Sequence, residues 1–111
     1  MRAKSRSDGL DRNGYAPSIL QDDMEHCFLC GRCDRKLDRH EIFPGTAYRA
    51  KSKRYGLWVL LCNQPCHEGK DGAQYNREIR ERLSTYAQRR AMEEYGWTVE
   101  EFRAEFGKNW M

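Results

Sequence analysis

The sequence predicts an α+β domain, with short strands in its middle and helices in its C-terminal third. Two apolar runs, 41–43 and 57–61, are too short for ordinary helices and indicate strands. Apolar residues at helical spacing after residue 74 indicate the helices. A chain of 111 residues has room for one compact domain. We therefore expect a single structured domain over residues 24–111.

Residues 1–23 are expected to form a flexible basic segment. The opening "MRAKSR" carries three positive charges, and "DGLDRNGYAPS" is interrupted by Gly, Asn and Pro. A disordered tail is the favoured interpretation, and a basic arm that touches phosphates is the alternative. The chain has no apolar run long enough for a membrane span and no signal-peptide core, so we expect a cytoplasmic protein without membrane contact.

A basic stretch joins the two predicted strands. We expect "PGTAYRAKSKRYG" to be a loop, because a proline-glycine pair ends regular structure. It carries four cations within six residues: Arg49, Lys51, Lys53 and Arg54. Two interpretations stay open. The cations lie on a solvated turn, or they grip a nucleic-acid backbone together with the flanking Tyr48 and Tyr55.

Two helices are predicted after residue 74. The first has apolar residues at intervals of three and four: Tyr75, Ile79, Leu83, Tyr86 and Ala87. Gly96 is its expected end. A second helix should begin after Thr98, which is a suitable N-cap with Glu101 at the capping-box position, and should end at Gly107. Both apolar stripes are expected to pack into the core.

Five cysteines lie in two groups, "CFLCGRC" and "LCNQPCH". In a reducing compartment such cysteines are metal ligands more often than disulfides, and two cysteines separated by two residues form the usual half of a tetrahedral zinc site. We expect a structural zinc ion held by Cys27, Cys30, Cys62 and Cys66. Cys33 could replace Cys30, or His67 could replace Cys66. The binding energy of zinc would compensate for a small core, since 33% of the residues are charged.

The stretch "HEIFPG" places His40 and Glu41 between the cysteine groups. A zinc protease needs a second histidine at position 44, which is proline here, so that class is excluded. If both cysteine groups bind one zinc ion, His40 and His67 come close together beside the basic stretch. Two histidines and a carboxylate can hold a divalent ion and supply a neutral imidazole as a general base.

The order of these motifs resembles the HNH (His-Me finger, ββα-metal) endonucleases. The similarity covers roughly residues 24–110: a cysteine pair, "HEIFPG", a basic stretch, "YGLWVLLC", "CH", a helix and the closing "FRAEFGKNW". It is strongest to small proteins of phages and prophages. The resemblance implies a zinc-stapled ββα-metal fold with C-terminal helices and metal-dependent hydrolysis of DNA with low sequence specificity. Beside DNA, phage packaging or recombination proteins are candidate partners, but the sequence does not indicate whether they recruit this chain.

The resemblance also assigns roles to residues. His40 matches the base that deprotonates a water molecule, and His67 matches the metal-binding histidine. Glu41, or Asp38, would supply the carboxylate ligand for Mg²⁺ or Mn²⁺.

The chain departs from the family at three points. Many members have two adjacent histidines where this chain has His40 and Glu41, so base and ligand could exchange roles. The middle asparagine of the family has no counterpart in "RYGLW", and Asn63 and Asn76 are the nearest candidates. Some relatives have a histidine near Gln74. The alternative function is a non-catalytic zinc module that binds DNA or a partner protein.

Overall fold

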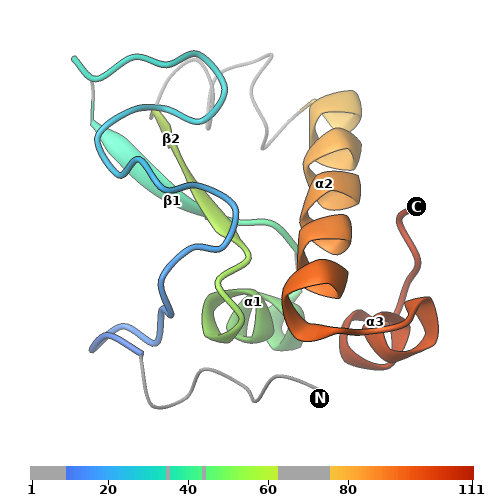
Figure 1. Ribbon diagram of the computed structural model, residues 1–111. Helices are drawn as coiled ribbons and strands as arrows, with labels where there is room; N and C mark the ends of the chain where they lie inside the picture. The colour runs from blue at the N-terminus through green and yellow to red at the C-terminus, as the bar shows by residue number, and fades with distance from the viewer. Residues whose placement is uncertain (1–9, 35, 44, 63–75) are drawn as a thin grey trace.

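The structure, a computed structural model, combines a two-stranded sheet with three helices and confirms the α+β class (Figure 1). It describes residues 10–34, 36–43, 45–62 and 76–111. In chain order the elements are β1 (Leu37–Glu41), α1 (Thr46–Arg54), β2 (Trp58–Cys62), α2 (Arg77–Tyr95) and α3 (Val99–Phe106). Among the described residues, no helix is both long enough and apolar enough to cross a membrane.

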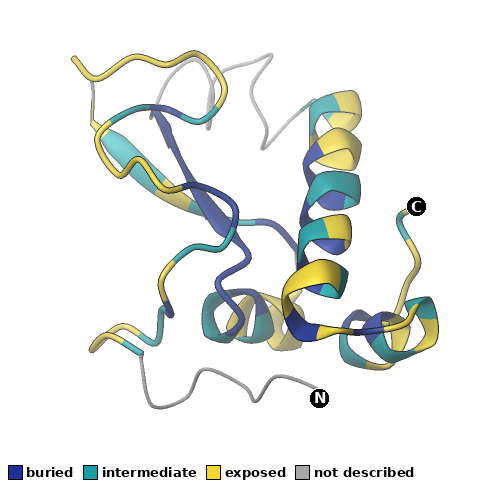
Figure 2. Ribbon diagram, in the orientation of Figure 1, coloured by how far each residue is buried: buried dark blue, intermediate teal, exposed yellow. Residues whose placement is uncertain are grey.

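The two strands are antiparallel, with Leu37 opposite Cys62 and Glu41 opposite Trp58. Every residue of β2 is buried, whereas β1 is half-exposed, so β2 runs through the centre of the molecule (Figure 2). The predicted second strand is confirmed, shifted by one residue. The predicted first run, 41–43, is wrong as a strand: β1 ends at Glu41, and the two residues after it turn inward and are buried in the core.

The outer edge of β2 is covered by the chain that precedes β1. The Ser18 hydroxyl donates to the carbonyl of Trp58 at 2.7 Å, and the Leu60 N–H donates to the side-chain oxygen of Gln21 at 2.8 Å. The Phe28 N–H donates to the carbonyl of Leu60, also at 2.8 Å. Because β2 is buried, these backbone groups would otherwise lack partners. The preceding chain therefore completes the sheet without forming a third strand.

Residues 10–23 fall within the stretch that was expected to be a flexible segment. In the structure they run along the sheet, with Ala16 and Leu20 buried. Gly56 allows their close approach: its φ is +73°, and a Cβ atom there would lie 2.3 Å from the carbonyl oxygen of Pro17. The described part of the segment thus contributes to the core.

The basic stretch forms a helix, α1, and the prediction of a loop at 46–54 is wrong. Pro44 and Gly45 precede the helix, and most of the residues that follow are good helix formers. The three cations in the last turn also interact favourably with the negative end of the helix dipole. Ser52 anchors the helix: it is buried, its hydroxyl oxygen accepts from the Phe43 N–H, and its carbonyl accepts from the Leu57 N–H.

The C-terminal helices are confirmed, with the predicted caps. Helix α2 ends at Gly96 in the left-handed conformation. Thr98 and Glu101 form a reciprocal capping box at the start of α3, and Gly107 ends α3. The core lies between β2, the inner face of α2 and the aromatic face of α3, where Phe43 packs against Phe102 and Phe106.

Candidate metal centre and adjoining pocket

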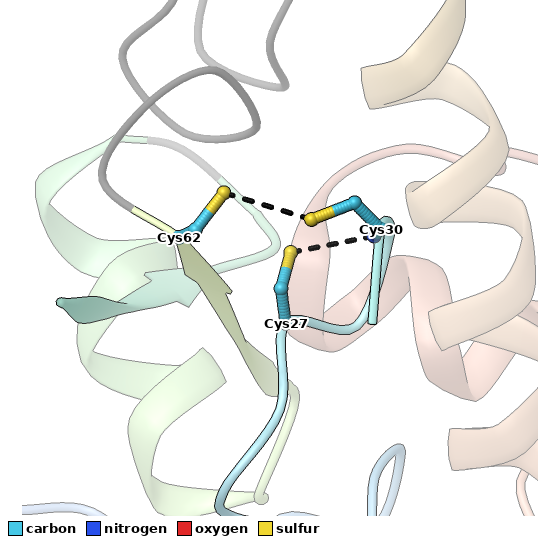
Figure 3. A group of neighbouring side chains, drawn as sticks. All are labelled: Cys27, Cys30 and Cys62. Atoms are coloured by element: carbon cyan, nitrogen blue, oxygen red, sulfur yellow. Dashed lines mark hydrogen bonds between the residues drawn. The ribbon is translucent and has the colours of Figure 1, made fainter. Parts of the chain in front are cut away.

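Three cysteines lie together at one end of the sheet (Figure 3). Cys27 and Cys30 come from the turn that precedes β1, and Cys62 is the last residue of β2. Their sulfur atoms all lie within 4.8 Å of one another, and those of Cys30 and Cys62 are 3.7 Å apart. All three thiols are free of disulfides. The group could hold a metal ion.

A tight turn holds the first two cysteines in place. The carbonyl of Cys27 accepts from the Gly31 N–H at 2.9 Å, and the Cys27 N–H donates to the carbonyl of Arg32 at 2.8 Å. Gly31 has a φ of +76°, which suits glycine. The Cys30 N–H points at the sulfur of Cys27, 3.5 Å away. The turn therefore presents both sulfurs toward Cys62.

The environment of Cys27 favours its thiolate. Burial raises the pKa of this thiol, but hydrogen bonds from the backbone N–H groups of Cys30, Cys62 and Leu29, together with the Cys30 thiol, outweigh that effect. The net result lowers the pKa from 9.0 to about 7. Because a thiolate is the form that binds metal, the site is prepared for a cation.

The sulfur geometry fits zinc. Two thiolates on one tetrahedral zinc ion, each with a bond of about 2.3 Å, lie roughly 3.8 Å apart. The distance between Cys30 and Cys62 matches this value. Cys33 is exposed and outside the group, so the structure selects Cys30 over Cys33. Cys66 and His67 lie outside the described residues, and the identity of the fourth ligand stays a prediction.

His40 borders a pocket of about 320 Å³ between β1, α2 and the chain that follows α3. His40 pairs with Val59 across the sheet. This pair lies three residues, or about 10 Å along the strand, from the pair formed by Leu37 and Cys62. The other walls include Arg77, Arg80 and Ser84 from α2 and Lys108 and Trp110 from the C-terminal chain. A histidine thus lies beside cationic side chains near the cysteine group.

Glu41 also borders this pocket, but its carboxylate is held elsewhere. One oxygen accepts from the Tyr15 hydroxyl at 2.7 Å, and the other accepts from Nε and Nη2 of Arg49 at 3.2 and 3.1 Å. Burial and the neighbouring Glu41 raise the pKa of Tyr15, so its hydroxyl stays protonated as a donor. The Glu41 side chain is only 6% exposed.

The alternation of strand residues separates His40 from Glu41. Consecutive residues of a strand point to opposite faces, so the structure does not bring the Glu41 carboxylate to the His40 imidazole. Asp38, two residues before His40, shares its face. Asp38 is not among the residues that line the pocket, and its role as a metal ligand stays a prediction.

The four cations predicted to grip nucleic acid lie on α1, and each contacts its own chain. Their contacts are Arg49 with Glu41, Lys51 with the carbonyl and carboxylate of Glu105, Lys53 with the ring of Tyr15, and Arg54 with the ring of Tyr55. Arg49, Lys51 and Lys53 thus join α1 to other parts of the domain, whereas the contact of Arg54 is with its neighbour in the chain.

Sequence reasoning missed the cations of the pocket, Arg77, Arg80 and Lys108. The spacing of Arg77 and Arg80 by three residues at the start of a predicted helix was a usable signal, since it places both on one face. Lys108 has no comparable signal beyond its position in "FGKNW". Within residues 10–34, 36–43, 45–62 and 76–111, the cysteine group is the single set of three metal-binding side chains.

Comparisons of the chain with protein-family models, with curated proteins and with solved structures found no match. Any functional assignment therefore depends on the site itself.

Proposed function

We propose that this chain is a metal-dependent endonuclease of the HNH type that hydrolyses DNA. The observation that carries the proposal is the position of His40, which lines a pocket together with Arg77 and Arg80. Phosphodiester cleavage requires a base that accepts a proton and cations that neutralise phosphate, and the pocket offers both. The chain order β1, β2, α2 is also that of a ββα-metal unit, with α1 inserted between the strands.

In this proposal the cysteine group binds zinc in a structural role. Cys27, Cys30 and Cys62 provide three thiolates, and Cys66 is the proposed fourth ligand. A site closed by four protein ligands has no open position for substrate, so the zinc would stabilise the fold and take no part in the reaction. It would tie the turn before β1 to the end of β2 and thereby fix the strand that carries His40.

His40 acts as the general base. Its neutral imidazole accepts a proton from water, and the resulting hydroxide attacks phosphorus while the bond to the 3′ oxygen breaks. The departing 3′ oxygen takes a proton from solvent. The products are a 5′ phosphate and a 3′ hydroxyl. A bound Mg²⁺ or Mn²⁺ ion would supply charge stabilisation for the phosphate and the departing oxygen. Asp38 and His67 are its proposed ligands, and Arg80 neutralises charge on the substrate.

Plasmid nicking tests the proposal. Zinc-loaded protein should convert supercoiled plasmid to the nicked form when Mg²⁺ or Mn²⁺ is added. His40→Ala should reduce the rate by at least a hundredfold and leave the zinc content and circular dichroism unchanged, because general-base catalysis contributes roughly 10²–10⁴-fold. His26→Ala is the matched control, since this exposed histidine pairs with Asp23 and does not border the pocket. Absence of nicking with several divalent ions would exclude the nuclease.

A second candidate function is a non-catalytic zinc module that binds DNA or a partner protein. It needs only the group of Cys27, Cys30 and Cys62, which could hold a metal ion. Both candidates bind zinc. They differ in the plasmid assay, where the binding module retards DNA but leaves it intact.

A further inference from the structure

The pocket beside His40 has an excess of positive charge on its walls. Arg77 and Arg80 come from the first two turns of α2, and Lys108 follows α3. Glu81 also borders the pocket, and its carboxylate pairs with Nε of Arg77 at 3.0 Å. Within the described part of the chain, Arg80 and Lys108 have no acidic partner. Two positive charges thus face a pocket large enough for a phosphate group.

The chain after α3 is held in place beside α2 (Figure 1). The side chain of Gln88 is fully buried: its oxygen accepts from the Trp110 N–H at 2.6 Å, and its amide donates to the Asn109 side chain at 2.8 Å. The Thr85 hydroxyl donates to the carbonyl of Trp110 at 2.8 Å. Nζ of Lys108 lies 4.1 Å from the centre of the Trp110 ring. These hydrogen bonds hold the backbone next to Lys108 against α2, so the residue is kept at the edge of the pocket.

Two cations of α1 are less suited to this role. Arg49 would have to leave the nearly buried carboxylate of Glu41, and Lys51 would have to leave Glu105. Among the described residues, Arg80 and Lys108 have no ion pair to break. They are therefore available to a phosphate at smaller cost than Arg49 and Lys51.

We propose that Arg77, Arg80 and Lys108 form the phosphate-binding site for a DNA strand, next to the phosphodiester group that faces His40. This inference rests on the proposed nuclease function and names the residues that would hold its substrate. It moves the expected DNA contact from α1 to the start of α2 and the C-terminal chain.

Fluorescence anisotropy tests the site with a labelled 20-base-pair duplex and full-length, zinc-loaded protein without added Mg²⁺ or Mn²⁺. Each phosphate contact contributes about 0.9 to the slope of log K against log salt, or about eightfold in affinity at 0.1 M salt. Arg80→Ala and Lys108→Ala should each lose about that much affinity and flatten the slope by about 0.9. Arg89→Ala is the matched control. It removes the same charge from another face of α2 and should bind as the wild type does.

The inference is overturned if both variants keep wild-type affinity, or if Arg89→Ala loses as much. It is also overturned if thymidine monophosphate or inorganic phosphate binds but the duplex does not. Its failure is distinguishable from failure of the nuclease. Duplex binding that depends on Arg80 without any cleavage removes only the nuclease. Cleavage at full rate by the Arg80 and Lys108 variants removes this site and the role given to Arg80, but leaves His40 as the base of a nuclease.

Discussion

Replacing Gly56 by alanine tests whether the N-terminal chain packs on β2 as described. The new Cβ atom would lie 2.3 Å from the carbonyl oxygen of Pro17 and 3.3 Å from the nitrogen of Ile19. Both neighbours are backbone atoms, so no side-chain rotation can relieve the contact. The chain around Pro17 must move away from the sheet.

The cost can be built from three contributions. A left-handed φ costs an alanine about 1 kcal/mol, and displacement of the chain breaks the hydrogen bond from the Ile19 N–H to the Gly56 carbonyl, which contributes about 1 kcal/mol. Partial exposure of Ala16 and Leu20 adds about 1–2 kcal/mol. We expect Gly56→Ala to lower the free energy of unfolding by about 3–4 kcal/mol.

Gly96→Ala provides the matched comparison. Gly96 also has a positive φ, +67°, but a Cβ atom there meets nothing within 4 Å, so only the conformational cost of about 1 kcal/mol applies. Each substitution also reduces the entropy of the unfolded chain by a similar amount, and this effect cancels in the comparison. The expected difference between the two variants is therefore about 2–3 kcal/mol.

Urea denaturation followed by circular dichroism measures this difference. The free zinc concentration must be equal in all samples, because a metal that binds only the folded state adds to its stability. Equal destabilisation by the two substitutions would refute the reasoning. It would mean that Pro17 does not press on Gly56 and that the chain before β1 does not cover the edge of β2.

Three further predictions concern the metal centre and the pocket. Cys62→Ser should leave the chain largely unfolded by circular dichroism, whereas Cys33→Ser should stay folded; a folded Cys62 variant would contradict the structural role of the metal. Because the folded state lowers the pKa of Cys27 from 9.0 to about 7, the metal-free chain should lose stability as the pH falls from 9 through 7. The zinc affinity, measured by competition with a chromophoric chelator, should drop below pH 7. A zinc affinity that is flat from about pH 6 to 8 would count against this. Asp38→Asn should slow plasmid nicking by the folded protein at least tenfold. Glu41→Gln should instead lower the free energy of unfolding by about 1–3 kcal/mol and leave the nicking rate of the folded protein unchanged. Slower nicking by the Glu41 variant, with normal nicking by the Asp38 variant, would assign the ligand role to Glu41.

The elements that sequence reasoning identified are those whose signals are local. The capping box of Thr98 and Glu101 and the left-handed glycines Gly96 and Gly107 mark helix ends through bonds between near neighbours. Cys27 and Cys62 are far apart in the sequence and come together in the fold. On a polar chain, however, grouped thiols have few roles other than binding a metal ion. In both cases the residue types determine the outcome without knowledge of the tertiary structure.

The elements that sequence reasoning missed depend on tertiary contacts. Helix α1 buries a single residue, Ser52, so it has no apolar stripe that could reveal its period. The chain before β1 has the composition of a turn-rich tail, yet Ser18 and Gln21 supply the hydrogen bonds that the edge of β2 needs. A polar side chain that pairs with a distant backbone group looks in the sequence like a solvated one. Composition alone cannot distinguish the two.

His40 and Glu41 show how strand geometry divides roles between adjacent residues. As a pair they suggest one site, but the two-residue period of β1 directs them to different faces. The carboxylate of Glu41, bonded to Tyr15 and Arg49, fastens both the N-terminal chain and α1 to the strand. His40 is thereby set on a strand that is fixed from its other face, and Leu37, at the start of this strand, pairs with Cys62 of the cysteine group. Position, more than the identity of its neighbour, makes this histidine the candidate base.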